Sequence, residues 1–293
     1  MKLPRVVTHS GSFQPDDVFA VAALELMLGE IELVRTRDSK EFPSGDYVVD
    51  VGDIYDPASC RFDHHQAGGA GKRDNGLPYS AFGLVWKTYG SVIAGGDEVA
   101  RRIDERLVQS IDADDHGIEI FKQVGAAPVY SFVEAIYNLN PTWKEPDSLI
   151  DGYFKEAVAF AKRTLERMIE RERTKLEAET IIELAYKDAS DKRIIVLDGS
   201  LPAQDILGQY PEPLYVVKPA RQGSQWKVQV VDEPGHTHLQ RKPFPAEWAA
   251  KRDAGLISVT GVPDAVLCHQ LRFVAVAKSK EGAIALAKLA TEA

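Results

Sequence analysis

The chain has 293 residues, 44% of them hydrophobic and 27% charged, which is enough sequence to bury one large core or two ordinary ones. Its formal net charge of −9 excludes a surface that holds long nucleic acids by broad neutralisation of phosphates. No apolar run approaches the ~18 residues of a membrane span, and the N-terminus lacks a signal-peptide pattern. The two cysteines form no zinc or disulfide pattern, so we expect a cytoplasmic protein that does not associate with membranes.

Strand and helix patterns alternate in the first 66 residues. Strands are predicted at 5–10, 31–37, 46–53 and 61–66, and a helix at 16–28. This order favours an α/β fold with a mainly parallel sheet, in which ligands collect at the carboxyl ends of the strands. The residues that fall at such ends are His9, Asp50, His64 and His65.

The rest of the chain predicts helices first and a second set of strands later. The glycine-rich segment 67–76 is typical of a mobile loop. Helices are predicted at 79–90, 98–112, 128–140, 151–187 and 281–293, and strands at 192–198, 214–220, 226–232 and 265–277. We therefore expect a catalytic domain over 1–150, a linking helix over 151–190 and a smaller α/β substrate-binding domain over 191–293.

Two polar elements early in the chain are candidates for metal binding. In "HSGSFQPDD", His9 and Asp16 are potential ligands, although Asp16 and Asp17 also suit the capping of the next helix. In "VVDVGD", Asp50 ends an apolar strand, where each carboxylate oxygen can serve a different cation. The simpler interpretation of Asp50 is a turn aspartate.

Two further elements combine acids and histidines. In "RFDHHQ", a strand would place Asp63 and His65 on one face and His64 on the other, offering a ligand, a proton donor and an orienting carboxylate. The alternative is an exposed polar loop. In "IDADDHG", Asp112 follows an apolar residue and is the best candidate for pointing inward, whereas Asp114 and Asp115 suit the end of a helix.

The order of these four elements resembles that of the DHH phosphoesterase superfamily, and more closely its Myg-type branch of metal-dependent hydrolases. The segments that carry the resemblance are "THSGSFQPDDVFA", "VRTRD", "VVDVGDIYDP", "RFDHHQ", "SAFGLVWKTYG" and "IDADDHG". Looser similarity continues in "LNPTW", "RKPFPAEWA" and "VPDAVLCHQLRFVAVA". The resemblance implies a DHH-type N-terminal domain and two divalent ions, Mn²⁺ or Mg²⁺, that serve phosphoester hydrolysis.

The resemblance also implies a role for individual residues. The implied metal ligands are His9, Asp16, Asp50, His64 and Asp112, with Gln14 standing where the branch usually has a histidine. The implied catalytic residues are Asp50, as a bridge between the ions, and His65, which would contact the scissile phosphate or protonate the leaving group. Substrate phosphate would be bound by His269, Arg241 and Arg272; Arg272 replaces a usual glycine, and His269 could equally be a core residue of a strand.

The predicted function is therefore that of a metal-dependent, exonuclease-like phosphoesterase. Its expected substrate is a small phosphorylated molecule or a short single-stranded nucleic acid. A pyrophosphatase or small-nucleotide phosphatase is the related alternative. A non-catalytic protein with a degraded metal site is the alternative from another class, motivated by Gln14. The sequence leaves a homodimer open.

Overall fold

The computed structural model describes residues 2–221, 224–236 and 239–293. Contacts within the chain divide it into two compact units, Met1–Arg173 and Thr174–Ala293, and each is described by itself. The division falls inside one long helix, α6 (Ile150–Asp188). The domain limits predicted at residues 150 and 190 fall close to the two ends of this helix.

A five-stranded sheet organises the first unit. Its order is β2 (Glu32–Arg35), β1 (Arg5–Thr8), β3 (Tyr47–Val49), β5 (Arg61–Phe62) and β4 (Tyr55–Asp56). The first four strands are parallel to their neighbours, and β4 is antiparallel to β5. Valines fill the middle of β1 and β3 because both faces of the sheet are covered. The predicted α/β class is confirmed, and the sheet is mixed with mainly parallel pairs.

Helices cover this sheet. They are α1 (Pro15–Leu28), α2 (Ala81–Ala94), α3 (Asp97–Ile103), the π-helical turn η3 (Asp104–Val108), α4 (Gln109–Asp115) and α5 (Phe132–Tyr137). Short 3-10 turns occur at η1 (Phe42–Ser44), η2 (Pro57–Ser59) and η4 (Asp147–Leu149). In α1 every residue from Pro15 to Leu24 is buried, and its Phe19 contacts Phe82 of α2 and Phe132 of α5. α1 is thus the central helix of the unit.

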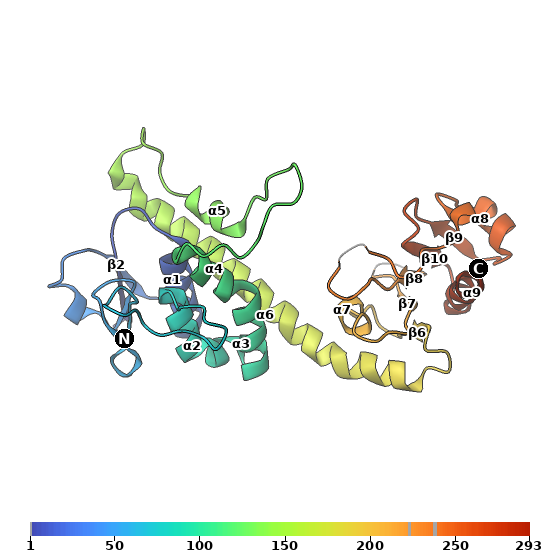
Figure 1. Cartoon of the computed structure of the whole chain (residues 1–293), viewed down its shortest axis with the longest axis horizontal. Helices are drawn as coiled ribbons and strands as arrows, with labels where there is room; N and C mark the ends of the chain where they lie inside the picture. Colours follow the sequence, from blue (N-terminus) through green and yellow to red (C-terminus); the bar gives the residue numbers. More distant parts are fainter. Residues whose placement is uncertain (1, 222–223, 237–238) are drawn as a thin grey trace. The chain divides into compact units, whose positions relative to one another are not determined.

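α5 is shorter than the helix predicted over 128–140. It begins only after Ser131, whose side chain accepts a hydrogen bond from the backbone of Glu134 and caps the helix. α5 lies beside the first part of α6 (Figure 1), where Phe132 stacks on Phe160 with ring centroids 5.5 Å apart.

α6 contributes apolar residues to both units. Phe154, Val158, Ala161, Leu165 and Ile169 are buried in the first unit, as their helical spacing predicts. Ala178 and Ile182 belong to a core cluster of the second unit. No helix within residues 2–221, 224–236 and 239–293 combines the length and apolarity needed to cross a membrane.

The second unit contains its own five-stranded sheet. The order is β6 (Ile194–Val196), β7 (Tyr215–Pro219), β8 (Trp226–Val230), β10 (Val274–Ala277) and β9 (Ala265–Cys268). Only β6 and β7 pair in parallel. α7 (Gln204–Leu207), η5 (Ala246–Trp248), α8 (Asp253–Thr260) and α9 (Lys280–Glu292) complete the unit. The strand predicted over 265–277 is in fact a hairpin, and Arg272 in its turn has a φ of 57°.

A close approach between α2 and α4 yields a stability prediction. A Cβ on Gly83 would overlap the carboxylate of buried Asp112, so Gly83→Ala is expected to lower the free energy of unfolding by about 1–3 kcal/mol. Gly152→Ala is the matched control, because that helical position is open and alanine favours helix by about 0.5–1 kcal/mol. Urea unfolding of the two variants measures both changes, and equal effects would contradict the close packing.

Candidate metal centre and active site

The carboxyl ends of three adjacent parallel strands carry the site. His9 follows β1, Asp50 follows β3, and Asp63 begins the run after β5. Parallel strands end at one edge of the sheet, so these residues converge there. The structure brings His9, Asp50, His64 and His65 together at these strand ends, in contact with one another.

Asp50 occupies the middle of the cluster. Its Oδ2 lies 3.2 Å from His9 Nε2, and its Oδ1 lies 3.3 Å from His64 Nε2. The residue is 4% exposed and has a φ of 55°, in the left-handed region that aspartate tolerates better than most residues. Asp50 therefore presents one oxygen to each histidine.

The first turn of α1 adds two buried carboxylates. Asp17 Oδ1 accepts hydrogen bonds from the backbone N–H groups of Gln14 and Val18, and its Oδ2 lies 3.1 Å from His9 Nε2. Asp17 thus both caps the helix and joins the cluster. Asp16 is 1% exposed, and its Oδ2 lies 3.8 Å from His64 Nε2.

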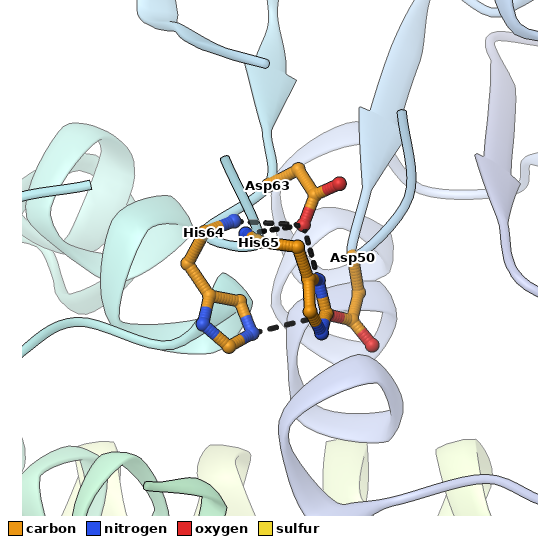
Figure 2. A group of neighbouring side chains, drawn as sticks. All are labelled: Asp50, Asp63, His64 and His65. Atoms are coloured by element: carbon orange, nitrogen blue, oxygen red, sulfur yellow. Dashed lines mark hydrogen bonds and ion pairs between the residues drawn. The ribbon is translucent and has the colours of Figure 1, made fainter. Parts of the chain in front are cut away.

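Asp63 orients the histidine pair (Figure 2). Its Oδ1 accepts from the backbone N–H groups of His64 and His65 and lies 2.7 Å from His65 Nδ1. Its Oδ2 accepts from the backbone of Asp53. Strand β5 ends at Phe62, so Asp63 and His65 meet in the turn beyond the strand rather than on one strand face. His64 turns toward Asp50, while the side chain of His65 is 55% exposed.

The end of α4 supplies an acid other than the one expected. Asp115 Oδ2 lies 3.4 Å from His64 Nε2, and His116 belongs to the same group of potential ligands. Asp112 is instead held by the Arg73 guanidinium and by the hydroxyl and backbone N–H of Ser80. The structure does not bring Asp112 into contact with His64, and its ligand role stays a prediction.

Sequence reasoning therefore missed Asp115 and His116, and it treated Asp17 only as a cap. The adjacent acids and histidine of "DDH" were the available signal for the first two. Because Asp112 and Asp115 lie close together in the sequence, the pattern did not indicate which of the two acids faces the strand ends.

Gln14 lies on the wall of an open cavity of about 450 Å³. His9, Asp50, His65 and Arg37 line the same cavity. Gln14 is exposed, whereas Asp16 two residues later is buried. The structure thus places the amide at the cavity mouth, beside the buried acids.

Three predicted substrate-binding residues lie in the second unit. Arg241 donates hydrogen bonds to the backbone carbonyls of Gly208, Tyr210 and Pro213. Arg272 donates to the carbonyl of Phe244. His269 is exposed in the β9–β10 turn, so it is not a core residue of a strand. Their binding of substrate phosphate stays a prediction.

Burial and like charge set the pKa values at the centre. Burial, and then the charges of Asp50 and Asp115, raise the pKa of Asp16 well above its usual range. Burial opposes ionisation of Asp50, but His64 and His9 outweigh it and lower the pKa of that carboxyl. Burial likewise disfavours the charged form of His9, yet Asp17 and Asp50 raise its pKa to about 10. The histidines compensate only part of the negative charge.

The donor set fits divalent cations. Several buried side-chain atoms have no hydrogen-bond partner among the described residues: both oxygens of Asp16, Asp17 Oδ2, Asp50 Oδ1, His64 Nε2 and Asp115 Oδ2. Buried polar atoms normally find a partner, and carboxylates with one or two imidazoles suit ions such as Mn²⁺ or Mg²⁺. The acids and histidines form three overlapping groups of potential ligand atoms.

Comparisons with known proteins agree on one family. The family model MYG1_exonuc, described as "Uncharacterised protein family (UPF0160)", matches residues 5–291. A relative named "MYG1 exonuclease" from Homo sapiens is 29% identical over 324 residues, covering 98% of this chain and 86% of the relative. A "MYG1 protein" from Chlamydia muridarum is 30% identical over 291 residues, covering 96% and 94%. A solved "pGpG-specific phosphodiesterase - PggH from Vibrio cholrae" covers 100% of this chain and 99% of its own at 13% identity, but its TM-score of 0.32 supports no argument.

Asp50→Asn is expected to weaken Mn²⁺ binding by at least about tenfold, because it removes charge from the middle of the donor set. Asparagine tolerates the left-handed backbone, so the fold is retained. Asp53→Asn is the matched control, since Asp53 has the same φ of 55° but is exposed. Titration calorimetry with Mn²⁺ measures both affinities. Equal affinities in the two variants would remove Asp50 from the ligand set.

The metal-free protein is expected to lose stability as the pH rises from the usual carboxyl pKa of 3.8 to about 8, above which the lowered pKa of buried Lys218 opposes the effect of His9. The pKa values of Asp16 and His9 are raised on folding, so over this range the folded state binds more protons than the unfolded chain. The free energy of unfolding therefore falls with pH. Urea unfolding in chelator between about pH 5 and 8 tests this trend, and Asp16→Asn should reduce the slope. A free energy that rises with pH would contradict it.

Proposed function

The chain belongs to the MYG1_exonuc family (UPF0160), and from this membership we propose that it is a metal-dependent phosphodiesterase acting on short nucleic acids in an exonuclease-like manner. The relatives named "MYG1 exonuclease" support hydrolysis of phosphodiester bonds. The proposal includes membership of the DHH phosphoesterase superfamily, on the order of the acid and histidine elements in the chain.

One observation carries the proposal. Asp50 directs one oxygen at His9 and the other at His64, among buried carboxylates of which several oxygens accept no hydrogen bond from the described residues. We propose that Asp50, together with His9, His64, Asp16, Asp17 and Asp115, holds two Mn²⁺ or Mg²⁺ ions. When bound, such a pair lowers the pKa of a water and stabilises both the attacking and the leaving oxygen of an in-line displacement.

His65 is the proposed proton donor to the leaving oxygen. Its Nδ1 is held by the Asp63 carboxylate, so Nε2 is the ring nitrogen available to hold or release a proton. The side chain is half exposed and lines the cavity beside Asp50. Asp63 keeps the ring oriented, so that Nε2 points away from the carboxylate that holds Nδ1.

The size and charge of the molecule favour a short substrate. The cavity of about 450 Å³ lies within the range of small-ligand sites, about 300–1,000 Å³. A net charge of −9 disfavours long nucleic acids, which bind through many phosphate contacts. The end of a short single strand suits both properties. The position of Gln14 at the cavity mouth leaves the buried donor set intact, which favours an enzyme over a protein with a degraded site.

His65→Gln tests the function separately from metal binding. We expect the variant to bind Mn²⁺ like the wild type but to hydrolyse short single-stranded oligonucleotides with a kcat lowered about 10²-fold or more. His236→Gln is the control, because His236 is exposed in the second unit. Steady-state kinetics on oligonucleotides, a generic phosphodiester and pyrophosphate measure the effect.

The outcomes of this experiment separate the candidate functions. If the wild type hydrolyses pyrophosphate but neither oligonucleotides nor the generic phosphodiester, the protein is a pyrophosphatase and not a nuclease. Bound Mn²⁺ without turnover of any phosphoester or anhydride would overturn the enzyme altogether. An unchanged kcat in His65→Gln would show that a group other than His65 donates the proton to the leaving oxygen.

A further inference from the structure

An arginine outside the predicted site lines the cavity. Arg37 follows strand β2 by two residues and is exposed. Its Nε donates to the carbonyl of Ser10, and its Nη2 lies 3.2 Å from His9 Nδ1. Arg37 therefore places a permanent positive charge at the edge of a centre that is otherwise rich in carboxylates.

The charge of Arg37 is not taken up by a neighbouring acid. Two other arginines near the centre are neutralised, Arg35 by Asp151 and Arg73 by Asp104 and Asp112. Arg37 has hydrogen-bond contacts only with Ser10 and His9, and no carboxylate of the described residues lies within ion-pair distance of it. Its guanidinium is thus available to an anion that enters the cavity.

The contact with His9 does not occupy the guanidinium either. His9 Nε2 faces Asp17 and Asp50, so Nδ1 is the atom near both the Ser10 carbonyl and Arg37. The guanidinium has more N–H donors than the contacts with Ser10 and His9 engage, so donors of Arg37 remain for another partner.

We propose that Arg37 forms a subsite for a second phosphate of the substrate, separate from the phosphate that is cleaved. This inference rests on the proposed function. Arg37 contacts His9 at the ring nitrogen opposite Nε2, so the width of an imidazole separates it from Asp50. A guanidinium recognises phosphate through two parallel hydrogen bonds, and the cavity is large enough for a terminal nucleotide. The substrate class is thereby a short oligonucleotide that carries a terminal phosphate.

The test compares one dinucleotide with and without a terminal phosphate, at the 5′ and at the 3′ end, in the presence of Mn²⁺. Wild type is expected to prefer one of the phosphorylated forms. Arg37→Met should lower kcat/KM for that form about 10- to 100-fold, mainly through KM, and change the unphosphorylated form less than about threefold. Arg37→Lys should retain part of the preference, since it keeps the charge but not the paired hydrogen bonds. Arg163→Met is the control, because Arg163 is exposed on α6.

Two other kinetic outcomes overturn the subsite. Equal losses on both dinucleotides would mean that Arg37 acts through His9, and no loss on either would mean that it has no role. If wild type hydrolyses neither dinucleotide, the proposed function fails. The subsite is then tested by calorimetry, in which the phosphorylated and the unphosphorylated dinucleotide are titrated onto wild type and onto Arg37→Met in the presence of Mn²⁺. The subsite is supported if wild type binds the phosphorylated dinucleotide more tightly and Arg37→Met does not. It is refuted if wild type binds both dinucleotides with equal affinity.

Discussion

Mutual repulsion among buried carboxylates is the constraint on which the first unit depends. Asp16, Asp17 and Asp50 are at most 4% exposed, and the basic groups that face them are His9, His64 and His65. Buried charges without full compensation cost several kcal/mol each, so apolar packing elsewhere must hold them together. The fully buried first turns of α1 and the valine-filled strands provide that packing. The proposed cation binding would therefore be coupled to folding in this unit, because an ion would remove a strain that the fold otherwise carries.

Hydrogen bonds outside the candidate metal centre hold in place the segments that repulsion between its carboxylates would otherwise separate. Asp63 accepts three bonds from the two residues that follow it. Arg73 and Ser80 hold Asp112, and with it the end of α4. Asn140 bonds both the N–H and the carbonyl of Phe13, which ties the first loop to a segment 127 residues away. Such outer contacts determine orientation, and orientation determines what a metal centre can do.

The sequence predicted the strand-end part of the site because polar residues after apolar runs are a local signal. The prediction that His9, Asp50 and His64 lie at one edge of the sheet required only the assumption that the strands pair in parallel. Asp112 is buried, as the sequence predicts, but the sequence could not show that Asp115 approaches His64. The π-helical turn η3 precedes α4 and shifts the faces that a 3.6-residue period would predict. The hairpin within 265–277 was equally hidden, since its turn places Arg272 at a positive φ without a glycine to signal it.

The backbone at Asp50 restricts which amino acids can replace it. A left-handed φ is accessible to aspartate, asparagine and glycine but costs more for longer side chains. Glutamate would keep the charge and lose the backbone conformation, whereas asparagine would keep the backbone and lose the charge. No single substitution at this position is conservative in both respects. As sequences of the family diverge, the left-handed backbone after β3 and the carboxylate at this position must therefore be retained together.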